Sequence, residues 1–220
     1  MLSLFYEKKL LESLVNYFIK PELMGYSVFR KVKTVVKKFN LDSRLVELFD
    51  SITPVLPSEW LKESLEMSLM MPLMNEKTKA ERIISPILLE VVKHYKNQVS
   101  FFSGENIDVD SSQDLSGECD FFFSLQPPKL YIEAPIISVA ESKDEDIEWG
   151  TAQCAAQLYG AKLFNEAEGK NIPVLYGCAT DGIEWRFMRF ENNIFYIDTK
   201  IYTDLKEVLG VWHHIIKLYI

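Results

Sequence analysis

A change of hydrophobic pattern near residue 75 constrains the fold of this chain more than any other feature. After residue 75 one further helical pattern covers 75–95, and segments rich in Phe, Ile and Val then dominate. The sequence therefore predicts an all-helical N-terminal region, residues 1–74, followed by an α/β (α+β) unit, residues 75–220. In the N-terminal region, apolar residues recur at helical spacing in segments 4–19, 27–39, 41–52 and 58–71. Asp42 and Ser58 are expected to cap the third and fourth of these helices.

The order of elements after residue 75 predicts a mixed sheet with helices on its faces. The central part reads α-β-β-β-α-β, an order that places layers of helix against a sheet. A turn at Thr180-Asp181-Gly182 joins two of the strands, and the last predicted strand is an edge strand. Pro86 predicts a kink in the helix at 75–95. After this helix, the predicted elements are strands 99–110, 117–125 and 129–143, helix 150–168, two strands within 172–190, strand 192–199 and helix 205–220.

Composition and targeting signals predict a cytoplasmic protein that does not enter a membrane. No apolar run reaches the roughly 18 residues that a membrane span requires, and the N-terminus has no signal-peptide layout. Cys119, Cys154 and Cys178 form no CxxC pair, so buried free thiols are predicted. The three histidines lack zinc-ligand spacing.

The net charge of −8 argues against tight, non-specific binding of nucleic acid, but the charge is unevenly distributed. Residues 1–74 contain ten Lys and Arg against nine Asp and Glu, a net charge of +1, so residues 75–220 carry a net charge of −9. Arg30, Lys33 and Lys37 would share one face of a helix. That face is either an ordinary solvated surface or a surface that follows phosphates.

The strand ending in Glu141-Ser142-Lys143 has an acid and a base at its tip. Side chains two apart on a strand point the same way, so Glu141 and Lys143 share a face and Ser142 lies opposite. If a hairpin joins this strand to the previous one, Asp120 can meet Glu141. Two close carboxylates repel each other, and Mg²⁺ would relieve that repulsion. The alternative is a solvated strand end without a function.

Asp120…Glu141-Ser142-Lys143 resembles the D…(D/E)xK signature of the PD-(D/E)XK, or restriction-endonuclease-like, nuclease superfamily. The resemblance implies an αβββαβ core and a metal-dependent endonuclease that hydrolyses phosphodiester bonds of DNA by metal-activated water. It implies that Asp120, Glu141 and the Ser142 backbone carbonyl bind Mg²⁺, with Mn²⁺ as a substitute, and that Lys143 is catalytic. Cys119 stands where the nominal motif has proline. Homodimers are common among such nucleases.

A finer resemblance, to a cyanobacterial-type group within this superfamily, spans roughly residues 75–200. It is carried by segments such as EKTKAERIISPILLEV, SGECDFFFS and APIISVAESKDEDIEWGTAQCAAQLYGAKLFNE.

The resemblance also implies two further site residues. The helix before the first strand often supplies a carboxylate, for which Glu81 and Glu90 compete. Nine residues at about 100° each put these two on opposite faces of a helix, and Glu81 flanks the apolar stripe that faces the sheet. Glu81 is therefore expected in the metal site, with an ordinary ion pair as the alternative. In the helix after Lys143, Gln153 is expected near the site, whereas Gln157 stands where one nuclease branch has tyrosine.

Two functions stay open at this point. One is the nuclease, and the other is a catalytically inactive module that keeps the fold for binding or regulation. The acidic run Asp144-Glu145-Asp146 would repel phosphate unless it points away, which favours the second. The intact trio of Asp120, Glu141 and Lys143 favours the nuclease, because an inactive module has no physical need to keep two like charges together. The sequence does not distinguish DNA from RNA, single from double strands, or any preferred sequence.

Overall fold

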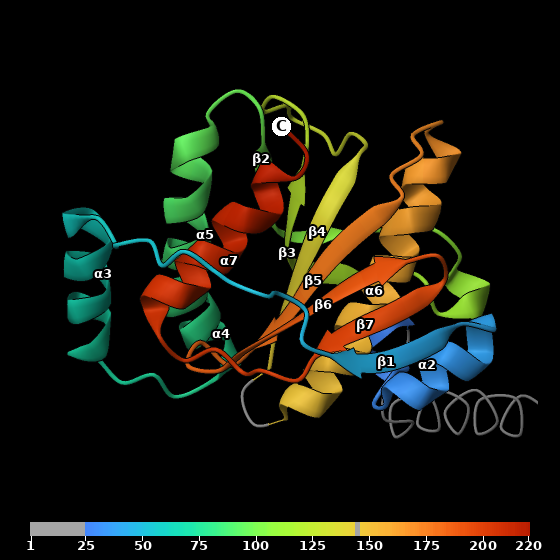
Figure 1. The fold of residues 1–220 in the computed structure, drawn as a ribbon, viewed down its shortest axis with the longest axis horizontal. Helices are drawn as coiled ribbons and strands as arrows, with labels where there is room; N and C mark the ends of the chain where they lie inside the picture. Colours follow the sequence, from blue (N-terminus) through green and yellow to red (C-terminus); the bar gives the residue numbers. More distant parts are fainter. Residues whose placement is uncertain (1–24, 144–145) are drawn as a thin grey trace, which may run out of the picture.

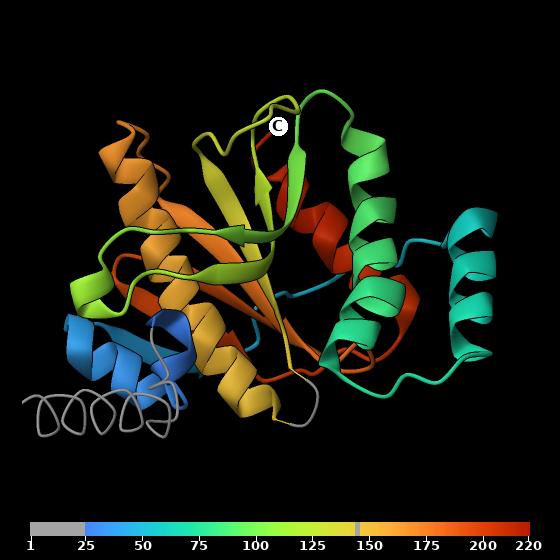
Figure 2. The ribbon, with the colours of Figure 1, turned by 180° about the vertical axis from the view of Figure 1, so that it is seen from behind.

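The computed structural model describes residues 25–143 and 146–220 as one sheet covered by helices on both faces, as Figures 1 and 2 show. The strands are β1 (Asp42–Val46), β2 (Ser100–Asn106), β3 (Glu118–Ser124), β4 (Ile136–Ser142), β5 (Val174–Thr180), β6 (Trp185–Glu191) and β7 (Ile194–Asp198). The α-helices are α2 (Val32–Phe39), α3 (Glu59–Leu69), α4 (Glu76–Lys79), α5 (Ser85–Val92), α6 (Ile147–Ala167) and α7 (Leu205–Lys217). Shorter helical turns are η1 (Gly25–Val28), η2 (Ala80–Ile84), η3 (Lys93–Tyr95) and η4 (Ser111–Gln113).

The seven strands lie in the order β1-β7-β6-β5-β4-β3-β2. Two neighbouring pairs, β1 with β7 and β4 with β5, are parallel, and the other pairs are antiparallel. The sheet is therefore mixed and the predicted α/β class is confirmed. Helix α6 connects β4 to β5, the long crossover that a parallel pair requires.

Alternation along the strands divides the apolar side chains between two cores. Phe121 and Phe123 point to the face covered by α5 and α7, where Phe123 meets Trp212 edge-on. Phe122, between them, points to the face covered by α6 and α2. Figure 1 shows α7 and α5 to the left of the sheet, with α3 outside α5, and α6 and α2 to its right; Figure 2 shows the same arrangement from behind. Both faces are buried, which explains the nearly continuous apolar strands in the sequence.

The helical pattern of residues 75–95 forms three pieces. Asn75 caps α4, and its side chain and that of Thr78 exchange hydrogen bonds with each other's backbone N–H groups. The chain then widens into a π-helical turn, η2, in which the Ser85 N–H donates to the Ala80 carbonyl. Pro86 follows in the first turn of α5. Because proline lacks an N–H and crowds the carbonyl four residues earlier, the predicted kink takes the form of this wider turn.

The predicted helix at residues 41–52 is wrong. Residues Asp42–Val46 form β1, which pairs in parallel with β7, and the following residues are irregular. A short apolar run has no decisive period, and the open hydrogen-bonding edge of β7 selects the extended form. The N-terminal region is therefore not all-helical, β7 is not an edge strand, and Asp42 begins a strand instead of capping a helix.

The predicted helix at 27–39 is divided into η1 and α2, so Arg30 lies outside the helix that carries Lys33 and Lys37, and the predicted shared helical face is wrong. The remaining predicted elements agree with the structure, with differences at their ends. Ser58 caps α3 by accepting from the Leu61 N–H, as predicted. The turn after β5 is closed by the Asp181 side chain, which accepts from the N–H groups of Ile183 and Glu184. The predicted strand at 129–143 is shorter, because only Ile136–Ser142 forms β4. The predicted helix at 4–19 lies outside the described residues.

All three cysteines are buried free thiols, as predicted. No helix within residues 25–143 and 146–220 has the length and apolar character needed to cross a membrane.

Candidate active site

Strands β3 and β4 bring Asp120 and Glu141 to the same end of the sheet. Phe121 lies opposite Ala140 in this antiparallel pair, so the next pair of positions is Asp120 and Glu141. The backbone N–H of Ser142 donates to Asp120 Oδ2 at 2.7 Å. Asp120 and Glu141 are therefore neighbours across the end of this strand pair.

Burial and neighbouring negative charges perturb the pKa values of both carboxyl groups. Glu141 is only 3% exposed. Burial, and then the negative charge of Asp120, raise the pKa of Glu141 well above its usual range. Burial also raises the pKa of Asp120 to about 6, although the hydrogen bond from Ser142 opposes this shift. A pair of this kind is stabilised by a shared proton or by a cation.

Lys143 reaches three groups from the tip of β4. Its Nζ lies 3.8 Å from Glu141 Oε1 and 3.2 Å from Glu76 Oε1. It also lies 4.9 Å from the centre of the Trp149 ring, in the first turn of α6. The ammonium group thus stands between the carboxylate pair, the start of α4 and the start of α6.

Helix α6 supplies a glutamine to the carboxylate pair, but it is Gln157 and not Gln153. Gln157 Nε2 donates to Glu141 Oε2 at 2.7 Å. Gln153 is buried one turn earlier, and its Oε1 has no hydrogen-bond partner in the part of the chain that the structure describes. Both amides lie on one face of an apolar helix, so the sequence could indicate the face but not the turn.

The helix before the sheet places Glu76, which the sequence analysis missed, closest to Lys143. The sequence contains a signal for Glu76, because Asn75 is a helix cap and Glu76 is therefore an acidic residue in the first turn of that helix. Glu81 lines the same cleft, but its side chain is 59% exposed and lies 3.9 Å from Lys77 Nζ. Glu81 therefore forms the ion pair that the sequence analysis left as the alternative, whereas Glu76 contacts Lys143.

Glu90, the alternative to Glu81, has a structural role elsewhere. Its buried carboxylate accepts from both the N–H and the hydroxyl of Ser58, at the start of α3. Burial raises its pKa, but these bonds and Lys93 outweigh burial and lower it overall. Glu90 therefore anchors α3 to α5.

A cleft of about 540 Å³ opens beside Asp120, on the α4 side of the site. Lys77 contributes a basic group to its lining. The acidic residues of the lining are Glu76, Glu81, Glu118 and Asp120.

The acidic run that follows Lys143 does not all face the site. Asp146 caps α6, and its Oδ1 accepts from the Trp149 N–H at 2.9 Å. Asp144 and Glu145 lie outside the described residues.

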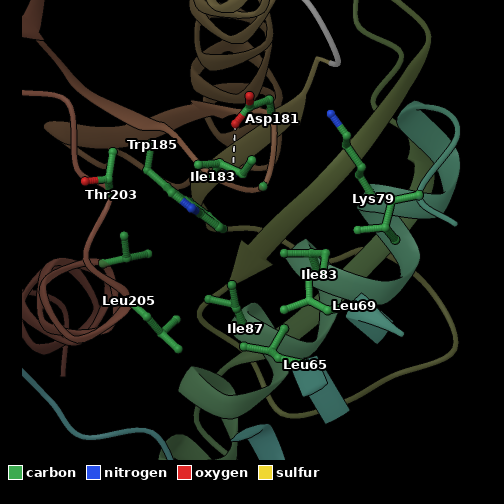
Figure 3. A pocket seen from close by; sticks show the side chains of 13 residues that line it. Leu65, Leu69, Lys79, Ile83, Ile87, Asp181, Ile183, Trp185, Thr203 and Leu205 are labelled. Carbon is green, nitrogen blue, oxygen red and sulfur yellow. Dashed lines mark hydrogen bonds between the residues drawn. The ribbon is translucent and has the colours of Figure 1, made fainter. Parts of the chain in front are cut away.

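A second hollow, of about 280 Å³, is apolar and lies among α3, η2, α5, the turn between β5 and β6, and the start of α7. Figure 3 shows Leu65, Ile83, Ile87 and Trp185 around it. Asp120, Glu141 and Lys143 do not line it. Lys79 and Asp181 are the charged residues of its lining, and the other lining residues are mostly apolar.

The donor set at the strand ends suits Mg²⁺ better than a transition metal. Within the described ranges, no group of three or more His, Cys, Asp or Glu side chains is arranged to hold a metal ion by itself. Asp120 and Glu141 supply two carboxylate groups. Mg²⁺ typically takes one or two protein carboxylates and completes its shell with water and phosphate oxygens.

No protein-family model matches this chain, and no curated protein matches it.

Proposed function

We propose that the protein is a Mg²⁺-dependent nuclease that hydrolyses phosphodiester bonds of DNA and has a PD-(D/E)XK core. The observation that carries the proposal is the carboxylate pair Asp120–Glu141 with Lys143 Nζ 3.8 Å from Glu141. Burying two like charges costs stability, and a chain gains nothing from it unless a cation or substrate uses them.

The element order supports the same proposal. Helices α4 and α5 precede the antiparallel strands β2, β3 and β4, and helix α6 then leads to β5, which lies parallel to β4. This is the αβββαβ order that the sequence resemblance implies. The carboxylate pair and Lys143 lie where β3 and β4 come together, next to the first turn of α6.

Each residue of the site has a role in this proposal. Asp120, Glu141 and the Ser142 carbonyl would hold Mg²⁺. The bound ion would supply Lewis acidity and lower the pKa of a water molecule at the site. Lys143 places a positive charge where a phosphate gains negative charge during hydrolysis. Gln157 orients the Glu141 carboxylate through its hydrogen bond.

The test combines metal binding with cleavage. Isothermal titration of Mg²⁺ or Mn²⁺ into the wild type and Asp120→Asn would run beside nicking assays on plasmid and single-stranded DNA. We expect the wild type to bind metal and cut, and the variant to lose at least about a hundredfold in rate. Glu133→Gln is the control, because Glu133 is a surface carboxylate paired with Lys129 before β4. Cleavage that survives in Asp120→Asn would contradict the proposal.

A second candidate is a catalytically inactive module with the same fold. Two observations favour it: the acidic lining of the cleft, and the contact of Lys143 with Glu76. Metal binding without cleavage of DNA or RNA would support this candidate. Homodimerisation stays a prediction that sedimentation velocity would test.

A further inference from the structure

Trp149 lies under two cations from distant parts of the chain. The Arg30 guanidinium carbon is 4.3 Å from the centre of its ring, and Lys143 Nζ is 4.9 Å from it. Arg30 comes just before α2, whereas Lys143 directly follows β4. The first turn of α6 therefore joins the basic N-terminal segment to the candidate catalytic lysine.

A third cation lies at the same turn. Arg186, on β6, forms an ion pair with Glu148, the residue before Trp149. Its Nε is buried and has no hydrogen-bond partner among the described residues. We call Arg30, Lys143, Trp149 and Arg186 the Trp149 surface.

The two sides of the carboxylate pair differ in charge. On the α4 side, the cleft is lined mainly by acids, including Glu76, Glu81 and Glu118. On the α6 side, Arg30 and Lys143 lie over the Trp149 ring, and Arg186 pairs with Glu148 beside it. A phosphate backbone is repelled from the first side and attracted to the second.

We propose that the Trp149 surface receives the phosphate backbone of the nucleic acid, with Arg30 as a phosphate contact and Trp149 as a positioning residue for Lys143. This inference rests on the proposed function and adds the side from which the substrate enters. Arginine suits the role, because its planar guanidinium both stacks on an indole and binds two phosphate oxygens. The stacked geometry holds both cations in place before substrate arrives.

The binding test measures fluorescence anisotropy of a short labelled DNA duplex, with Ca²⁺ in place of Mg²⁺ to suppress cleavage. We expect Arg30→Gln to weaken binding about three- to tenfold at low salt and to reduce the salt slope by about one. Arg189→Gln is the matched control. Arg189 also stacks on an aromatic ring, Tyr196 at 4.7 Å, but it lies toward the opposite end of β6 from Arg186. Its loss is expected to leave binding unchanged.

The positioning role of Trp149 requires a kinetic measurement. Trp149→Leu is expected to lower kcat about tenfold or more, because Lys143 loses the ring that holds it, and Trp149→Phe to recover most of that loss. If Trp149 only stabilises the fold, variants of equal thermal stability should have equal kcat, and Trp149→Phe should not exceed Trp149→Leu. Circular dichroism would verify that each variant is folded.

The outcomes separate this inference from the nuclease proposal. If the wild type cleaves DNA but Arg30→Gln and Trp149→Leu bind and cleave normally, the inference is wrong and the nuclease stands. If the wild type binds DNA through Arg30 without cutting, the Arg30 phosphate contact is supported, and the nuclease and the positioning role are wrong. If the wild type does not bind the duplex at all, the proposed substrate surface is overturned.

Discussion

At the scale of single residues, the hydrogen bond from Gln157 to Glu141 is a contact whose contribution to the free energy of unfolding can be measured directly. Glu141 is almost fully buried, and Gln157 gives one of its oxygens a donor. Gln157→Leu is expected to lower the free energy of unfolding by about 1–3 kcal/mol, because a buried polar group loses its partner. Urea denaturation at neutral pH measures this change.

Gln153→Leu is the matched control for that experiment. Gln153 lies one turn earlier on the same face of α6, and its Oε1 already lacks a partner within the described residues. Its replacement is expected to cost less than that of Gln157. Equal losses in the two variants would show that the bond to Glu141 contributes nothing of its own.

The sequence could indicate Asp120, Glu141 and Lys143 as a group, because strand alternation and one hairpin are enough to bring them together. Glu76 and Gln157 could not be chosen in the same way. Glu76 lies far from Lys143 in the sequence, and the docking of α4 against the strand ends brings them into contact. The choice between Gln153 and Gln157 depends on the position of α6 along the sheet, and no local sequence pattern determines that position.

At the scale of elements, the contact of α6 with η1 depends on the absence of a side chain at Gly160. The ring of Tyr26 packs against Gly160, and its hydroxyl donates to the Ile107 carbonyl at 2.8 Å. A methyl group at this position would overlap the Tyr26 hydroxyl and lie 3.1 Å from ring atom Cζ.

Gly160→Ala is therefore expected to lower the free energy of unfolding by about 1–3 kcal/mol. Combining it with Tyr26→Phe removes the overlapping oxygen, so the double variant is expected to lose less than the two single variants together. Thermal denaturation of all three variants gives the coupling. If the loss in the double variant equals the sum of the two single losses, positions 26 and 160 are not energetically coupled.

The helices and strands from residue 75 onward followed from hydrophobic periodicity, whereas β1 did not. The segment Asp42–Val46 has one buried neighbour strand and an otherwise exposed surface, so its own residues carry little strand signal. Its conformation is determined by β7, which comes about 150 residues later in the chain. Likewise, Pro86 indicated a kink, but the hydrophobic pattern did not indicate its π-helical form in η2.

At the scale of the whole molecule, His213 makes stability depend on pH. It is 7% exposed, and its Nδ1 lies 2.8 Å from the Tyr95 hydroxyl, linking α7 to η3. Burial, followed by the charges of His94 and Lys217, lowers its pKa from 6.5 to about 4. Between about pH 6.5 and pH 4, His213 is therefore protonated in the unfolded chain but neutral in the folded chain.

Stability from His213 is thus complete above about pH 6.5 and decreases as the pH falls toward 4, by about 3 kcal/mol. Asp120 and Glu141 act in the opposite direction, because their raised pKa values favour the folded state at lower pH. The difference between the wild type and His213→Gln isolates the histidine. Urea denaturation from pH 4 to pH 7 should give a difference that shrinks on acidification. A constant difference would exclude this linkage.

The position of β1 in the sheet also determines how the chain can be shortened. A fragment of residues 75–220 contains the candidate site, but it would leave the backbone of β7 unpaired where β1 now binds. It would also uncover apolar side chains now packed against Phe29, Val35 and Leu61. Open strand edges pair with strands of other molecules, so we expect fragment 75–220 to form insoluble aggregates. A fragment of residues 25–220 keeps β1, and we expect it to stay in solution. Light scattering after dilution from urea would compare them.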